Sequence, residues 1–421
     1  MDYKNYLDWM LNRGDPQGDY TLDNVKKLLE ELGSIQNKIK IIHVAGTNGK
    51  GSVCSYIQNT LSGSNLKCGL FISPYIDDIR ETIQINGEYI SENDFVKCME
   101  VIYPIVLKLD SEGYYATSFE IFVAVAFLYF YENKVDTAVM EVGMGGRFDA
   151  TNIFDTPIAT VITSISLDHI NILGKTLKEI AWQKGGIIKD NVPVFIYPQK
   201  EEVMTELIRI AKEKNAPVHT FSLDDVKDIF STDKYNEFSF REHKNMRTSL
   251  LGKHQVYNAS LAIMTLDYLK KFFSISDDNL RKSISSAKNI GRIEVIKENP
   301  TFVLDGSHNA ESIDALIENL KTFSYNKLIL GFSVLGDKDI DYILKNLIPL
   351  ASSVVLTTID NPRAAGLEFL KREVSKYSNE VYAFEDRKIA FDKTVSLANE
   401  DDMILWCGSL YLIKDIRKFI I

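Results

Sequence analysis

The sequence predicts an α/β protein with two domains, each built on a mostly parallel sheet, and a small antiparallel appendage on the first. Short apolar runs alternate with long helical patterns, which is typical of parallel strands covered by helices on both faces. This alternation starts afresh after residue 300. The chain of 421 residues is also too long for one ordinary core, at about 150 residues per domain.

In the first domain, continuous apolar runs indicate strands that are buried on both faces. Between residues 218 and 250 the pattern becomes short, polar and alternating, which indicates the antiparallel appendage. The predicted strands are 39–45, 68–72, 137–142, 158–163 and 192–197. The predicted helices are 92–109, 118–134, 177–188, 201–214 and 254–273.

A domain boundary is predicted at 294–300, where a helical stretch ends in NIGR (289–292) and the polar run KENP (297–300) follows. The predicted domains are therefore 1–295 and 296–421. In the second domain, strands at 301–305, 327–332 and 353–358 alternate with helices at 310–323 and 340–350. This pattern predicts a Rossmann-like α/β domain.

The composition is that of an ordinary globular protein, with 45% hydrophobic and 25% charged residues. A formal net charge of −10 argues against nonspecific binding to nucleic acid or to an anionic membrane. The N-terminus lacks the apolar core of a signal peptide, and the longest apolar run, 121–130, is about half a membrane span. The four cysteines form no C-x-x-C pair and are expected to be buried thiols. We expect a cytoplasmic monomer with no nucleic-acid or membrane partner.

A glycine-rich loop joins the strand at 39–45 to the helical pattern that follows it. Backbone N–H groups of such a loop and the helix N-terminus favour a phosphate, Lys50 reaches the terminal phosphates, and Ser52 can ligate magnesium. The spacing departs from the common pattern, because Gly51 lies between Lys50 and Ser52, so a plain glycine-rich turn is the alternative. The loop predicts a P-loop nucleotide-binding domain. Its residues are Gly46, Thr47, Asn48, Gly49, Lys50, Gly51 and Ser52.

Glu141 lies at the end of the strand at 137–142 and opens the run EVGMGGRFDATN. An acidic residue at the carboxyl end of a parallel strand is typical of the residue that holds a nucleotide-bound metal. The glycines that follow allow the backbone to approach a ligand closely. Because a buried carboxylate needs a partner, a structural ion pair is the alternative.

Two further residues are candidate metal ligands. His169 follows the strand at 158–163, and its neutral imidazole can bind a metal, although a hydrogen-bonded loop histidine is the alternative. Lys184 lies in an apolar helix, where a lysine normally extends toward solvent. If Lys184 is buried instead, its pKa falls, and the neutral amine can be carbamylated to give a carboxylate ligand.

The second domain carries the run DGSHN (305–309) at a strand-to-helix junction, with Asn309 placed as an N-cap. A capped turn is the alternative to a functional loop. Arg292, near the predicted boundary, is either a surface cation or a phosphate clamp. Asn258 lies in a run that opens a helix and is a candidate contact to adenine.

Taken in order, these motifs closely resemble those of folylpolyglutamate synthase and dihydrofolate synthase, of the Mur ligase superfamily. The resemblance spans nearly the whole chain, and ten motifs in the family's order are highly specific. They are HVAGTNGKGS (43–52), SPYIDDIRETIQINGEYIS (73–91), TSFEIF (117–122), EVGMGGRFDATN (141–152), ITSISLDH (162–169), AWQKGGIIK (181–189), GKHQVYNA (252–259), GRIEVI (291–296), DGSHNA (305–310) and CGSLYLI (407–413).

The resemblance implies an ATP-dependent ligase that adds L-glutamate to a folate-type carboxylate through an acyl phosphate. The substrate would be tetrahydrofolate, for polyglutamylation, or dihydropteroate, for dihydrofolate synthesis, or both. The implied cofactors are ATP and two Mg²⁺ ions, and the resemblance also allows a K⁺ ion as a further cofactor. Magnesium and Lys50 would neutralise charge on the transferred phosphoryl group. Because water would hydrolyse the acyl phosphate, the two domains are expected to close around it, with the Arg292 region as pivot.

The resemblance also implies roles for individual residues. The first magnesium would be held by Ser52 and Glu141, and the second by Glu141, His169 and carbamylated Lys184. The residues that contact ATP would be those of the loop 46–52, Asn258 and, across the domain interface, Arg292 and Asp305. The catalytic residues would be Lys50, Lys184, Asp305 and His308, the last near the γ-phosphate and the incoming glutamate. The folate and glutamate contacts would be Ser73, Pro74, Tyr75, Arg80, Phe119, Asp149 and His308.

The sequence departs from the family at several positions. Tyr75 replaces a usual histidine and Thr82 a usual arginine, which puts the preference for the pterin in doubt because both lie in the loop expected to cover it. Ser307 replaces an alanine, Cys407 replaces a threonine, and Gln183-Lys184-Gly185 replaces glutamate-lysine-alanine. The expected catalytic positions are intact.

Two other functions are compatible with a glycine loop. A cell-wall Mur ligase would carry a nucleotide-sugar domain before the loop, and the 45 residues that precede Gly46 are too few for one. A nucleotide-dependent switch would need the loop but not a second α/β domain that bears Asp305 and His308. ATP consumption that is indifferent to glutamate would favour the switch.

Overall fold

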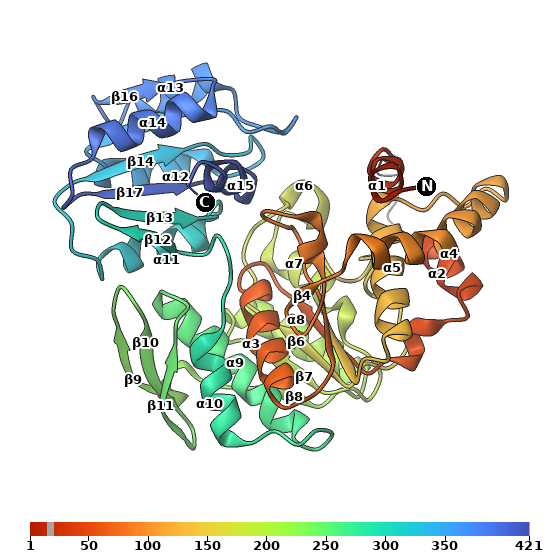
Figure 1. The fold of residues 1–421 in the computed structure, drawn as a ribbon. Coiled ribbons are helices and arrows are strands. Elements are labelled where there is room, and N and C mark those ends of the chain that lie inside the picture. Colours follow the sequence, from red (N-terminus) through yellow and green to blue (C-terminus); the bar gives the residue numbers. More distant parts are fainter. Residues whose placement is uncertain (15–20, 421) are drawn as a thin grey trace. The chain divides into compact units, whose positions relative to one another are not determined.

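The computed structural model describes residues 1–14 and 21–420, which form two compact units (Figure 1). Unit 1 comprises Met1–Asp225 and Asn258–Ile284, and unit 2 comprises Val226–Tyr257 and Ser285–Ile421. The chain therefore passes from one unit to the other three times. The division into domains 1–295 and 296–421 stays a prediction.

Unit 1 is built on an eight-stranded sheet in the order β4-β3-β2-β5-β1-β6-β7-β8. The strands from β2 to β8 in this order are parallel, whereas β3 and β4 form an antiparallel hairpin at one edge. Every residue of the central strands β5, β1 and β6 is buried, as the continuous apolar runs predict. The strands are β1 (Ile41–Ala45), β2 (Cys68–Phe71), β3 (Ile83–Ile85), β4 (Glu88–Tyr89), β5 (Thr137–Glu141), β6 (Ala159–Ile162), β7 (Val194–Ile196) and β8 (Val218–Thr220).

Helices cover this sheet in separate groups. Side chains of α1, α2, α4 and α5 share one apolar core with residues of β2, β3 and β5. Side chains of α7 and α8 form another core with residues of β6 and β7. The helices are α1 (Tyr3–Leu11), α2 (Asp23–Glu31), α3 (Lys50–Gly63), α4 (Glu92–Ser111), α5 (Ser118–Glu132), α6 (Ile170–Leu173), α7 (Leu177–Lys184), α8 (Glu201–Glu213), α9 (Lys253–Leu269) and α10 (Asp277–Ser286).

The structure corrects three details of the predicted elements in unit 1. Val218–Thr220 forms β8, a parallel edge strand of the large sheet, and does not belong to the antiparallel appendage; its exposed residues explain the polar pattern. The helix predicted at 177–188 ends at Lys184 and continues as the 3₁₀ turn Gly185–Ile187, because glycine disfavours the α-helix. The β3–β4 hairpin was not predicted, although Asn86-Gly87 is a typical hairpin turn and both residues have positive φ.

Unit 2 contains two sheets. The three-stranded sheet β11-β10-β9 is antiparallel and confirms the predicted appendage. The six-stranded sheet has the order β12-β13-β17-β14-β15-β16, in which only the edge strand β12 is antiparallel to its neighbour. The strands are β9 (Val226–Ser231), β10 (Asn236–Phe240), β11 (His243–Thr248), β12 (Glu294–Glu298), β13 (Thr301–Asp305), β14 (Leu328–Phe332), β15 (Ser353–Leu356), β16 (Val381–Ala383) and β17 (Met403–Cys407).

The polar segment at 294–300 is part of the second sheet. Glu294–Glu298 forms β12, and its residues are exposed or half-buried because an edge strand packs on one side only. Apolar side chains fill both faces of the sheet behind it. The helices on these faces are α11 (Ala310–Leu320), α12 (Ile340–Leu347), α13 (Leu367–Val374), α14 (Arg387–Leu397) and α15 (Leu410–Arg417).

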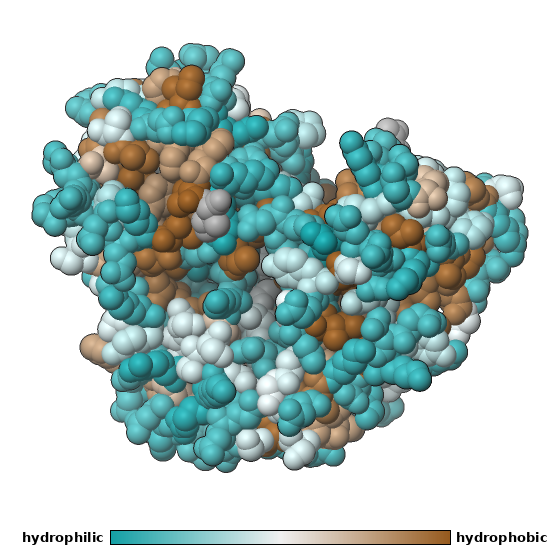
Figure 2. All heavy atoms as spheres, viewed as in Figure 1, coloured by the Kyte–Doolittle hydropathy of each residue, from teal (hydrophilic) through white to brown (hydrophobic). Residues whose placement is uncertain are grey.

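All four cysteines are buried, as the sequence predicts. Figure 2 shows mostly hydrophilic side chains on the face in view, with smaller hydrophobic patches between them. Across the described ranges 1–14 and 21–420, every helix is too short or too polar to cross a membrane.

Candidate active site

The glycine loop lies where β1 ends and α3 begins. Gly46 has a φ of 150°, and a Cβ at this position would lie 1.7 Å from Thr163 Oγ1. Gly49 has a φ of 85°, and a Cβ there would lie 2.6 Å from the side-chain oxygen of Asn258. Both positions therefore require glycine, for space and for backbone conformation. The second contact also places the buried amide of Asn258, predicted to contact adenine, directly against the loop.

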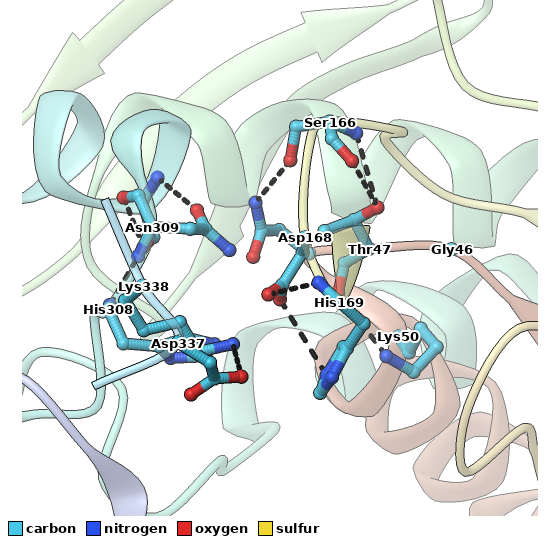
Figure 3. A network of polar contacts seen from close by, with 12 residues as sticks. Gly46, Thr47, Lys50, Ser166, Asp168, His169, His308, Asn309, Asp337 and Lys338 are labelled. Atoms are coloured by element: carbon cyan, nitrogen blue, oxygen red, sulfur yellow. Dashed lines mark hydrogen bonds and ion pairs between the residues drawn. The ribbon is translucent and has the colours of Figure 1, made fainter. Parts of the chain in front are cut away.

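The segment that follows β6 braces this loop. The Thr47 backbone N–H donates to the Ser164 carbonyl at 2.7 Å, and the Thr47 hydroxyl donates to the Ser166 carbonyl at 3.1 Å. The Ser166 backbone N–H donates back to Thr47 Oγ1 at 3.1 Å, and the Asn48 amide donates to Ser166 Oγ at 3.3 Å (Figure 3). Because β1 and β6 are neighbours in the sheet, two segments far apart in the sequence form one rim, as the bond between Asn48 and Ser166, 118 residues apart, shows.

Lys50 is the first residue of α3 and lies over the end of β5. Its Nζ donates to the Thr47 carbonyl at 3.2 Å and lies 3.9 Å from Glu141 Oε1. The side chains of Lys50 and Glu141 are only 16% and 6% exposed, so this pair is poorly screened by water. The ion pair considered for Glu141 is therefore present. Ser52, the other predicted magnesium ligand, is buried in the first turn of α3.

Lys184 points into the molecule and does not extend toward solvent. It is 4% exposed, and its Nζ donates to the Gly46 carbonyl at 2.7 Å. Burial, and secondly the charge of Lys50, lower the pKa of Lys184 to about 7. A substantial fraction of Lys184 is therefore the neutral amine near neutral pH, which is the form that carbamylation requires. The same side chain fixes the first residue of the glycine loop.

His169 is the N-cap residue that precedes the short helix α6 and has a φ of 50°, in the left-handed region. Its backbone N–H donates to Asp168 Oδ1 at 2.8 Å, and its Nε2 lies 3.9 Å from Asp168 Oδ2 (Figure 3). Among the described residues, neither His169 nor Glu141 belongs to a group of three histidine, cysteine or acidic side chains whose ligand atoms lie within 4.8 Å of one another. A second metal site built on them must therefore draw on another kind of ligand.

Phe119 and Asp149 meet at the backbone of Gly143. A Cβ at Gly143 would lie 2.7 Å from Phe119 Cζ and 3.2 Å from Asp149 Oδ2. Asp149 is buried, and its Oδ2 accepts the Met144 backbone N–H at 2.8 Å. Burial raises the pKa of Asp149, whereas its hydrogen bonds from Thr151 and from backbone N–H groups oppose this shift. The structure thus brings two predicted folate contacts together in the segment after β5.

Ser73, Pro74 and Tyr75 begin a loop whose shape is set by one carboxylate that sequence analysis missed. Glu81 is 5% exposed and accepts backbone N–H groups from Ile76 at 2.9 Å, and from residues 77 and 78 at 2.8 Å each. The signal was present, because an acid at 78 with a glutamate three residues later is a capping box.

Arg80, a predicted folate contact in the same loop, is turned toward its own loop. Its Nε and Nη2 donate to both carboxylate oxygens of Asp78, at 2.5 to 3.1 Å. This bond to Asp78, first of all, raises the pKa of Arg80. A folate carboxylate at Arg80 would therefore have to compete with Asp78.

In unit 2, the segment after β13 forms the predicted capped turn. The Asn309 side chain accepts the Ser312 backbone N–H at 3.0 Å, in a capping box at the start of α11. Asp305 is buried and accepts the backbone N–H groups of Ile293 and Ser307, at 2.9 Å each. These bonds fix Asp305 to the segment that contains Arg292.

His308 contacts the Gly306 carbonyl through Nδ1 at 2.8 Å. A carbonyl only accepts, so Nδ1 carries a proton and donates it to Gly306.

Arg292 lines a groove of about 1030 Å³ within unit 2. The groove also contains Glu294, which forms an ion pair with Arg417.

Sequence analysis missed a further charged pair after β14. The Lys338 side chain is only 5% exposed, and its Nζ lies 3.8 Å from Asp337 Oδ2 (Figure 3). The charged run DKD (337–339), a few residues after a buried strand, was the available signal.

Comparison with known proteins identifies similar chains along the full length. Residues 44–266 match the Mur ligase middle domain, and residues 291–410 match the Mur ligase glutamate ligase domain. The dihydrofolate synthase/folylpolyglutamate synthase of Bacillus subtilis is 38% identical over 430 residues, covering 99% of this chain and 98% of that protein.

Two solved structures are similar over the whole chain. The Mycobacterium tuberculosis folylpolyglutamate synthase complexed with ADP and AMPPCP has a TM-score of 0.90 at 29% identity, covering 100% of this chain and 99% of that one. E. coli FolC in complex with DHPP and ADP has a TM-score of 0.88 at 26% identity, covering 100% and 98%.

Proposed function

This chain belongs to the Mur ligase family, and we infer from this premise that it is an ATP-dependent ligase of the folylpolyglutamate synthase and dihydrofolate synthase branch. It joins L-glutamate to a folate-type carboxylate. The observation that carries this function is the match of both Mur ligase domains, in order, with the glycine loop and Lys50 at the carboxyl end of a central strand.

The reaction follows from the poor electrophilicity of a carboxylate. A carboxylate oxygen of the folate-type substrate attacks the γ-phosphorus of ATP, the bond to the β,γ-bridging oxygen breaks, and ADP leaves. The amine of glutamate then attacks the carbonyl carbon of the acyl phosphate and loses a proton, and inorganic phosphate leaves as the amide forms. Fixed positive charge around the transferred phosphoryl group is the usual source of most of the acceleration.

We propose that residues Gly46 to Ser52 bind the ATP phosphates. The first N–H groups of α3 carry partial positive charge and favour an anion, and the two positive-φ glycines let the backbone approach it. Lys50 Nζ would exchange the Thr47 carbonyl and the Glu141 carboxylate for phosphate oxygens. Asn258, packed against Gly49, is proposed to contact the adenine.

The side chains of Ser52 and Glu141 fit a magnesium ion, because both offer hard oxygen ligands and both are buried beside the loop. Bound there with ATP, magnesium would supply positive charge to the phosphates. The second proposed site fits only after a chemical change. The Lys184 amine donates to the Gly46 carbonyl, whereas a carbamate at Lys184 would supply the hard oxygen ligands that magnesium prefers, beside His169 and Glu141. A K⁺ site stays a prediction.

The proposed carbamylation of Lys184 is supported by its burial and by its pKa of about 7. Carbamylation reverses the charge of the side chain and leaves a single N–H on Nζ to donate to the Gly46 carbonyl, so the two states hold the loop differently. Intact mass measured in bicarbonate buffer and in CO₂-free buffer tests this proposal. Lys184→Met is the control, and its mass should be the same in both buffers. If the wild-type mass is also the same in both buffers, the modification is rejected.

We propose that the folate substrate binds beside Phe119 and Asp149, with the loop that begins at Ser73, Pro74 and Tyr75 and contains Arg80. The aromatic ring of Phe119 suits a planar pterin, and the carboxylate of Asp149 suits its N–H groups. In unit 2, we propose that Arg292 and Asp305 act on ATP and that His308 acts near the incoming glutamate. We further propose a monomer in the cytoplasm.

The test is ATP-dependent incorporation of labelled glutamate, with dihydropteroate and tetrahydrofolate offered separately. The two substrates decide between dihydrofolate synthesis, polyglutamylation and both. Lys50→Ala should lower turnover at least about a thousandfold while the protein stays folded, with a lower melting temperature because Glu141 loses its cation. Lys97→Ala, which removes an exposed lysine on α4, is the control and should be fully active. Near-normal turnover of Lys50→Ala would remove the loop from the mechanism.

A further inference from the structure

A chain of hydrogen bonds runs from the middle of β1 to Asp149. The Nε2 atom of His43 lies 2.8 Å from Thr151 Oγ1, and the Thr151 hydroxyl lies 2.6 Å from Asp149 Oδ1. The Thr151 backbone N–H donates to the same Asp149 oxygen at 3.0 Å. His43 and Thr151 are fully buried, so no water competes for these bonds. The three residues therefore form one buried polar chain behind the proposed folate contact.

The direction of each proton follows from the partners. An ionised carboxylate only accepts, so the single hydroxyl proton of Thr151 goes to Asp149. Thr151 Oγ1 can then only accept from His43, and His43 must carry its proton on Nε2. Its Nδ1 has no hydrogen-bond partner among the described residues, which costs less for a bare acceptor than for an N–H group. Burial, and secondly the charge of Lys189, lower the pKa of His43 well below its usual value and keep it neutral.

These bonds place the two carboxylate oxygens of Asp149 differently. Oδ1 accepts two donors from Thr151, whereas Oδ2 accepts the Met144 N–H and lies where Phe119 approaches Gly143. The Gly143 backbone N–H also stabilises the carboxylate, so Oδ2 is the oxygen on the side of Phe119 and of residues 143 and 144. The chain thus fixes both the rotamer of Asp149 and the oxygen that it presents.

We propose that Thr151 and His43 are positioning residues for Asp149, which hold its carboxylate in the orientation in which Oδ2 faces the folate-type substrate. This inference rests on the proposed function, because the contact between Asp149 and the substrate is part of it. Removing the Thr151 hydroxyl frees the Asp149 side chain to rotate, and the substrate must then restore the orientation at the expense of its own binding. The loss should appear in the KM of the folate-type substrate.

The experiment is a double-mutant cycle on the full chain, with KM measured for each of the three substrates. Thr151→Val keeps the shape and should raise the KM of the folate-type substrate about tenfold, because a hydrogen bond to a charged group is lost. Thr151→Ser keeps the hydroxyl and should restore this KM to within about twofold. His43→Leu should raise it roughly threefold, because only a neutral hydrogen bond is lost. The KM values of ATP and glutamate should not change.

Asp149→Ala separates this inference from the proposed function. If Thr151 acts through Asp149, the double variant Thr151→Val/Asp149→Ala should have the same KM for the folate-type substrate as Asp149→Ala alone. If Asp149→Ala leaves this KM unchanged, the proposed folate contact and the present inference both fail. If Asp149→Ala raises it but Thr151→Val does not, or if the two effects multiply, the positioning role alone is overturned.

A second measurement uses the unmodified protein and does not depend on the folding of a variant. Nitrogen-15 NMR of the six labelled histidines reports which ring nitrogen carries the proton, and the spectrum of His43→Leu assigns the His43 signals. The proton should be on Nε2 and the ring should stay neutral from pH 6 to 8. A proton on Nδ1, or a charged ring in this range, would overturn the proposed direction of the chain.

Discussion

Replacing Lys184 by methionine removes a buried amine whose charged form the fold disfavours. The usual pKa of a lysine is 10.5, and burial lowers that of Lys184 to about 7. The unfolded chain keeps the usual value, so between these two pH values the unfolded state binds about one more proton than the folded state. The free energy of unfolding of the wild type should therefore rise with pH across this window.

The size of the effect follows from the difference of 10.5 and 7, which is about 3.5 pKa units or about 5 kcal/mol. Below pH 7 the whole of this amount opposes folding, and it is relieved as the pH rises toward 10.5. Between pH 7 and 9 the wild type should gain about 2 kcal/mol relative to Lys184→Met, because half of the folded molecules have already lost the proton at pH 7.

The assay is urea denaturation in CO₂-free buffer at pH 7, 8 and 9, followed by tryptophan fluorescence. Of the three tryptophans, Trp9 and Trp182 lie in unit 1 and Trp406 in unit 2, so a Trp406→Phe background reports on unit 1 alone. In bicarbonate buffer, carbamylation would replace the titrating amine and the gain with pH should shrink.

Lys178→Met is the matched control, because it removes an exposed lysine from the same helix. Its effect on the free energy of unfolding should stay within about 0.5 kcal/mol. The reasoning would be refuted if, in CO₂-free buffer, the difference between wild type and Lys184→Met stayed constant from pH 7 to 9.

Three further substitutions test the site. Gly46→Ala should abolish ATP binding in equilibrium titrations, because its Cβ would lie 1.7 Å from Thr163 Oγ1; normal binding would contradict the steric argument. Glu141→Gln should raise the magnesium concentration that gives half-maximal activity at least about tenfold, and an unchanged titration after chelation would exclude Glu141 as a ligand. Glu81→Gln should raise the KM of the folate-type substrate severalfold without changing that of ATP, because the bonds that shape the loop after Ser73 weaken; equal changes in both would point to general destabilisation.

The features that sequence analysis predicted correctly are those with a local signal. Apolar runs followed by glycine or acidic residues indicated the central strands and the loops after them, as at Gly46 and Glu141. The N-cap at Asn309 depends on residues three positions apart and was also predictable. Such features depend on backbone geometry within a few residues, which the sequence records directly.

The features that escaped prediction depend on contacts between distant residues. The bond from Lys184 to Gly46 joins residues 138 positions apart, and nothing near Lys184 indicates that it points inward. Strand β12 looked like a polar linker because an edge strand is half exposed. The bond of His43 to Thr151 was not predicted either, because His43 lies within an apolar run. A histidine in a strand with buried neighbours on both sides nevertheless needs a polar partner.

The loops after β1, β5 and β6 are tied to one another as well as to their strands. Lys184 and the turn at Arg147, whose backbone N–H donates to the Gln183 carbonyl, connect the segments further. Loops of this kind do not behave as interchangeable modules. Grafting one of them from a related enzyme would leave its partners mismatched, so altered substrate scope in this scaffold should require the loops to be exchanged together.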